Sequence, residues 1–63
     1  MTQKELLYFE DAISHEQNII AYLNDMLNSI NDDNLIPFIE EEQKKHKNTQ
    51  KKLIKVIKEY SND

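Results

Sequence analysis

Apolar residues recur at alternating steps of three and four along the first half of the chain. The series runs Leu6, Phe9, Ile13, Glu16, Ile20, Leu23, Leu27 and Ile30, and Glu16 is its single polar member. This spacing is the a/d heptad seam of a helix that packs against other helices. Thr2 and Glu5 form the Thr-x-x-Glu pattern of a capping box at its start. The pattern therefore predicts a helix over residues 3–30.

The apolar arc of this helix is wider than the seam that packs against a single partner helix. The g positions next to the seam hold Ala12, Ile19 and Met26, and the c positions beyond them hold Tyr8, His15 and Tyr22. At 100° per residue these positions widen the arc to about 160°. One helix cannot cover such an arc, so we expect a bundle of three or four helices. At its c position, His15 is expected at the edge of a second helix contact rather than as a ligand.

A second helix follows the only turn signal in the chain, Asn31-Asp32-Asp33-Asn34. Asp33 or Asn34 is the expected N-cap, which places Pro37 in the first turn, where a missing N–H costs little. We predict a turn over residues 31–33 and a helix over residues 34–60. Its seam is expected to contain Ile36, Ile39, Leu53, Ile57 and Tyr60, flanked by Leu35, Ile54 and Val56.

The seam of the second helix becomes polar between Glu40 and Gln50, where its positions are occupied by Gln43, His46 and Gln50. A short connection makes the two helices antiparallel neighbours. Equal rise along both helices then places Glu16 level with Thr49, between His46 and Gln50. We therefore predict one buried polar layer of Glu16, Gln43, His46 and Gln50, with apolar layers above and below it.

Two interpretations of this layer remain open. A hydrogen-bonded polar layer can fix the register and the oligomeric state of a bundle. Alternatively, di-iron bundles use a Glu from one helix and a Glu-x-x-His pair from the next. The candidate ligands would be Glu16, Glu42 and His46, with iron or manganese as the metal. The residue three before His46 is the neutral Gln43, however, and Glu42 lies one position off, at g.

Composition favours association over catalysis. The chain has 63 residues, no cysteine and no glycine, so its own core is small and no disulfide supports it. Neither a serine nor a cysteine stands in a pattern with a base, and we expect no catalytic residues. The net charge is -4, and the seven lysines between Lys44 and Lys58 lack arginine or aromatic neighbours. They predict a solvated face that could meet an acidic neighbour, rather than a nucleic-acid site.

Several short motifs resemble the small ferritin-like proteins of spore-forming Firmicutes that are related to spore coat protein F. They are Leu-Leu-Tyr-Phe-Glu-Asp-Ala-Ile-Ser-His-Glu from Leu6, the Tyr22 region, the Asn-Asp-Asp-Asn-Leu turn, and Gln43-Lys-Lys-His46. The resemblance implies a helical hairpin that dimerises into a four-helix bundle, and a role in the spore coat or in sporulation. Rubrerythrins and encapsulated ferritins are a more distant likeness, in which Glu16, a Glu at position 43 and His46 would bind metal. The signature Ser-Gln-Glu-Leu-Asp of sporulation phosphatases is not matched by Ser14-His-Glu-Gln-Asn18.

These observations predict an all-α fold: one antiparallel two-helix hairpin over residues 1–63 that pairs into a ferritin-like four-helix bundle. The core and dimer interface is expected to comprise Leu6, Phe9, Ile13, Ile19, Ile20, Leu23, Met26, Leu27, Ile36, Ile39, Leu53 and Ile57. The expected function is a non-enzymatic structural or assembly role without a cofactor, and the alternative is a di-metal binding protein or oxidase. Expected partners are further copies of the chain and coat proteins, without nucleic acid or membrane. With no signal peptide or apolar run of roughly 20 residues, we expect a cytoplasmic or spore-associated location.

Overall fold

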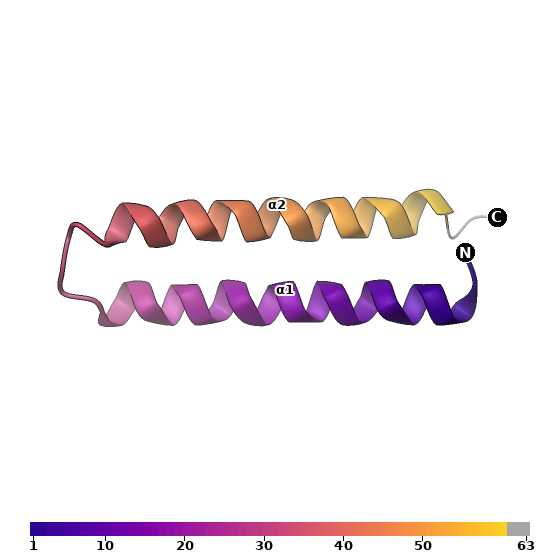
Figure 1. Ribbon diagram of the computed structural model, residues 1–63, viewed down its shortest axis with the longest axis horizontal. Coiled ribbons are helices and arrows are strands. Elements are labelled where there is room, and N and C mark those ends of the chain that lie inside the picture. Colours follow the sequence, from indigo (N-terminus) through magenta and orange to yellow (C-terminus); the bar gives the residue numbers. More distant parts are fainter. Residues whose placement is uncertain (61–63) are drawn as a thin grey trace.

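The computed structural model describes residues 1–60, which form an antiparallel hairpin of two helices, α1 (Gln3–Ser29) and α2 (Ile36–Tyr60). The helices lie side by side along their whole length, and the start of α1 is next to the end of α2 (Figure 1). The described residues contain no strand. The predicted all-α hairpin is thus confirmed.

Helix α1 begins at the predicted capping box. The Thr2 N–H donates to Glu5 Oε1 over 2.8 Å, and the Glu5 N–H donates to Thr2 Oγ1 over 3.1 Å. These two bonds satisfy backbone donors that the first helical turn cannot pair internally. At the other end, Ile30 is extended and its N–H still donates to the carbonyl of Met26. Helix α1 ends one residue before the predicted boundary.

The connection is longer than predicted, and the expected N-cap of α2 is wrong. Asp32 organises this segment: its Oδ1 accepts from the Asn34 N–H over 2.9 Å, and its carbonyl accepts from the Leu35 N–H over 3.1 Å. Residues 33–35 therefore form a turn, and α2 begins at Ile36 rather than at residue 34. Pro37 lies in the first turn of α2, as predicted, where its missing N–H leaves no intrahelical bond unmade.

The hairpin is a thin rod with a small core. Its extents are 48 × 15 × 10 Å and its radius of gyration is 14.7 Å, against roughly 10.6 Å for a compact domain of this length. Ile20 and Ile39 are the only buried residues between residues 1 and 60. The other predicted interface residues are half-buried, namely Leu6, Phe9, Ile13, Ile19, Leu23, Met26, Leu27, Ile36, Leu53 and Ile57. Two helices alone thus leave most of the seam partly in contact with water.

Candidate functional site

The two polar positions of the seam meet at mid-length of the hairpin. Glu16, the central residue of α1, places Oε2 2.5 Å from His46 Nδ1 on α2. The Glu16 side chain is 17% exposed and the His46 side chain is 28% exposed. The two side chains therefore form a hydrogen bond between the helices. This contact agrees with the register that the antiparallel arrangement predicts.

A second carboxylate lies at the other ring nitrogen of His46. Glu42, one helical turn earlier on α2, has Oε2 3.8 Å from His46 Nε2. Its other oxygen, Oε1, lies 3.4 Å from the Lys45 ammonium. The imidazole is thus flanked by Glu16 on one side and Glu42 on the other. Although Glu42 is at a g position, its side chain reaches the polar layer because a g position borders the d position that His46 occupies.

The amide of Gln50 bonds to a different part of α1. Its Nε2 donates to Gln17 Oε1 over 3.0 Å and lies 3.4 Å from the carbonyl oxygen of Ile13. Gln17 was not predicted as part of the site. Gln17 occupies an e position, next to the seam. The sequence feature that could have indicated its role is its place beside Glu16, level with the polar part of α2.

The polar layer is therefore divided between the two long sides of the hairpin. Gln43 lines a shallow groove with Pro37, Glu40, Lys44 and Lys47, on the side where Gln50 meets Gln17. The acid–imidazole set faces the opposite side. The reason is geometric: in α2 both glutamines are at a positions, which border e, whereas His46 is at d, which borders g.

The four predicted layer residues are half-buried in a single chain. Between residues 1 and 60 no polar residue is fully buried, and no buried side-chain polar atom lacks a hydrogen-bond partner. No group of three or more His, Cys, Asp or Glu side chains in this part of the chain is arranged to hold a metal ion. Full burial of the layer remains a prediction, and the metal site remains its alternative interpretation.

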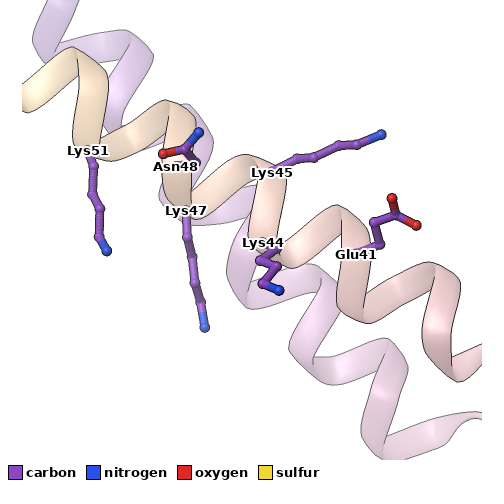
Figure 2. Close-up of a pocket in the computed structure, with 6 residues that line it drawn as sticks. All are labelled: Glu41, Lys44, Lys45, Lys47, Asn48 and Lys51. Atoms are coloured by element: carbon purple, nitrogen blue, oxygen red, sulfur yellow. The ribbon is translucent and has the colours of Figure 1, made fainter.

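The outer surface of α2 is basic. Glu41, Lys44, Lys45, Lys47, Asn48 and Lys51 line a shallow groove on this helix. Lys44, Lys47 and Lys51 point to one side of α2, whereas Lys45 points to the other (Figure 2). In the described part of the chain, none of these three lysines forms an ion pair with an acidic side chain. Three free ammonium groups on one side keep that side in water.

Comparison of the chain with protein-family models, with curated proteins and with solved structures finds no match. Neither helix, over the residues described, is both long and apolar enough to cross a membrane.

Proposed function

We propose that this protein is a non-enzymatic structural or assembly component that acts as a homodimer, in which two hairpins form a four-helix bundle. The observation that carries the proposal is the half-buried seam. Ten apolar residues at seam and g positions are neither fully buried nor fully exposed in the single hairpin. Apolar side chains at such positions gain hydrophobic free energy when a further helix layer covers them.

The accessible surface supports the same conclusion. The chain exposes 5164 Å², whereas a compact monomer of its mass would expose roughly 4,250 Å². The difference, about 900 Å², matches the roughly 800 Å² that each partner contributes to a standard protein interface. A symmetric dimer would therefore return the chain to the surface area of an ordinary folded protein.

In this assembly the polar layer would specify the arrangement of the helices. Sliding the helices would separate Glu16 from His46 and place a carboxylate against aliphatic side chains, at a cost of several kcal/mol. A single polar layer in an apolar seam is therefore suited to fixing register and helix number.

The association with the spore coat rests on the resemblance of the motifs around Leu6, Tyr22 and His46 to coat protein F relatives. An all-helical hairpin without a nucleophile–base pair suits a packing component. The test is to fractionate spores of the source organism. Recovery of the chain in the coat fraction would support the assignment, and confinement to the soluble fraction of the spore core would contradict it.

The homodimer is tested by light scattering and sedimentation at several concentrations. A dimer should have twice the 7.5 kDa of one chain. A folded, helical species of 7.5 kDa that persists across the concentration range would overturn the proposal.

The second candidate is a di-metal binding protein, and the position of Glu42 favours it. One chain brings two carboxylates to the two ring nitrogens of His46. Two copies together would offer four carboxylates and two imidazoles, the ligand number of di-iron carboxylate bundles. Glu42 would then supply the carboxylate that the Glu-x-x-His pattern places at position 43, where this chain has Gln43. Bound iron or manganese would supply Lewis-acid or redox chemistry in a site that these residues hold away from bulk water.

Elemental analysis separates the two candidates. The protein is purified without chelators and its iron and manganese content is measured per chain, with Glu16→Ala and Glu41→Ala as matched variants. The structural proposal predicts no stoichiometric metal in any of the three. A stoichiometric metal that is lost in Glu16→Ala and retained in Glu41→Ala would establish the metal-binding alternative.

A further inference from the structure

The two long sides of the hairpin differ in chemistry. In an antiparallel helix pair the g positions of both helices border one side and the e positions border the other. We call the first side the tyrosine face; its apolar members are Tyr8, Ala12, Ile19, Tyr22 and Met26 of α1 with Leu35, Phe38 and Val56 of α2, and it also carries His15, Glu42, Lys45 and Lys52. We call the second side the amide edge; it comprises Leu7, Glu10, Gln17 and Asn24 of α1 with Glu40, Lys44, Lys47, Lys51 and Ile54 of α2.

The tyrosine face is mostly apolar along α1, and its aromatic side chains are uncovered. Tyr8, Tyr22 and Phe38 are 60%, 70% and 72% exposed. Tyr8 and Ala12 of α1 line a shallow apolar groove together with Leu53 of α2, which shows that the two helices share this surface. Aromatic side chains bury large areas at low entropic cost, and they are enriched in interfaces.

The amide edge is closed and charged. The Gln17–Gln50 hydrogen bond spans it at mid-length. Lys44, Lys47 and Lys51 extend on this side of α2 and form no ion pair with an acid within residues 1–60 (Figure 2). Leu7 and Ile54 are the large apolar side chains exposed here. Burial of three uncompensated ammonium groups would cost more than the burial of these two residues returns.

The pattern of the tyrosine face is nearly symmetric about its middle. On α1, Tyr8 and Tyr22 stand seven residues before and after His15, with Ala12 and Ile19 between them. His15 lies at the level of the Glu16–His46 contact. A surface that repeats when its ends are exchanged is suited to an isologous contact, in which the same patch of both copies meets about a two-fold axis.

We propose that a second copy of the chain docks on the tyrosine face, with a two-fold axis that crosses the rod at the level of His15, so that α1 lies antiparallel on α1 and α2 on α2. This inference rests on the proposed homodimer and deepens it, because it assigns the face and the axis. Tyr8 of one copy then lies over Tyr22 of the other, and the two His15 residues lie opposite each other.

The apolar residues of α1 favour this axis. The contacts of Glu16 with His46 and of Gln17 with Gln50 place His15 level with about Thr49 of α2. Rotation about the axis lays the apolar α1 side of one copy on that of the other. The other face-to-face two-fold, parallel to the rod, would place α1 on α2 of the second copy and set Ala12 against Lys52 and Ile19 against Lys45.

Cysteine cross-linking tests the axis, since the chain has no cysteine of its own. In the oxidised His15→Cys variant we expect most of the dimer to become disulfide-linked, because the two introduced residues face each other near the axis. Tyr8→Cys should not cross-link to itself, as the two positions are separated by about 21 Å along the rod. Asn18→Cys, on the outer surface of α1 at a similar level, is the matched control and should also remain unlinked.

Charge insertion tests the face. Tyr22→Lys on the tyrosine face should raise the dimer dissociation constant roughly tenfold or more, whereas Leu7→Lys on the amide edge should leave it unchanged. The Tyr22 and Leu7 side chains are 70% and 53% exposed in the hairpin, so both substitutions are made at positions that face solvent in one chain. The proposal would be overturned by a dimer that resists Tyr22→Lys or fails to cross-link through His15→Cys. An unmodified chain that never dimerises would instead overturn the proposed function.

Discussion

At the scale of single residues, the Glu16–His46 contact is where the chain departs from an ordinary apolar seam. A hydrogen-bonded acid–imidazole pair can cost more in desolvation than it returns, whereas two well-packed apolar side chains of similar size carry no such cost. At 17% and 28% exposure, the two side chains are already partly withdrawn from water in one hairpin. A second copy on the tyrosine face would complete their removal from water. We therefore propose that the pair serves specificity more than stability.

The double variant Glu16→Leu with His46→Leu should be as stable as the unmodified protein or more stable. Glu16→Leu alone should cost about 1–3 kcal/mol, because it leaves the His46 ring nitrogen without its partner. Thermal and urea unfolding, followed by circular dichroism at one protein concentration, measure both. A large fall in the melting temperature of the double variant would mean that the pair is a net source of stability.

At the scale of the helices, the two N-termini are fixed by different devices. Helix α1 starts at a reciprocal capping box that involves only Thr2 and Glu5. Helix α2 starts after a turn in which Asp32 accepts hydrogen bonds from two following N–H groups. The turn that Asp32 forms precedes the helix, so α2 begins only at Ile36. The length of the connection thus depends on which Asx side chain forms the turn.

The capping box makes the first turn of α1 sensitive to acid. The Glu5 carboxylate accepts a hydrogen bond from the Thr2 backbone N–H. This bond, with a smaller contribution from the Thr2 hydroxyl, lowers the pKa of Glu5 below its ordinary value of 4.5. Because the folded pKa is below the unfolded one, this contribution to stability is complete above pH 4.5 and is lost as the pH falls through the folded value.

Titration of the Glu5 carboxyl by NMR should therefore give a midpoint below 4.5. In Thr2→Ala the midpoint should move part of the way back, since the hydroxyl is lost while the backbone N–H remains. Removal of the N-cap side chain should itself cost about 1 kcal/mol of helix stability. A Glu5 midpoint that does not change in Thr2→Ala would show that the box does not persist in solution.

At the scale of the whole molecule, the hairpin has too much surface for its mass. Its radius of gyration of 14.7 Å and its 48 Å length describe a rod with two buried residues in the part that the structure describes. With no disulfide, such a chain has few means of stabilising itself other than association. Its charge is also unevenly distributed, because the lysines gather on the part of α2 that lies away from the turn.

The melting temperature should rise with protein concentration. In the proposed homodimer folding and dimerisation are coupled, so mass action stabilises the folded dimer as the concentration increases. Calorimetry or circular dichroism melts over a wide concentration range measure this dependence. A melting temperature that stays constant over that range would indicate a hairpin that folds alone.

The sequence by itself determined the two helices, their antiparallel pairing, the capping box and the meeting of Glu16 with His46. These features follow from periodicity and from the length of the connection, which act through many residues at once. Only the tertiary structure decided the start of α2 at Ile36, the approach of Glu42 to His46, and the bond between Gln17 and Gln50. The start of α2 depends on the local turn that Asp32 forms, and the approach of Glu42 depends on its side-chain rotamer. The bond between Gln17 and Gln50 depends also on how far one helix is rotated against the other. A heptad pattern defines a seam and its two edges, but it does not determine which pairs of side chains along an edge will bond.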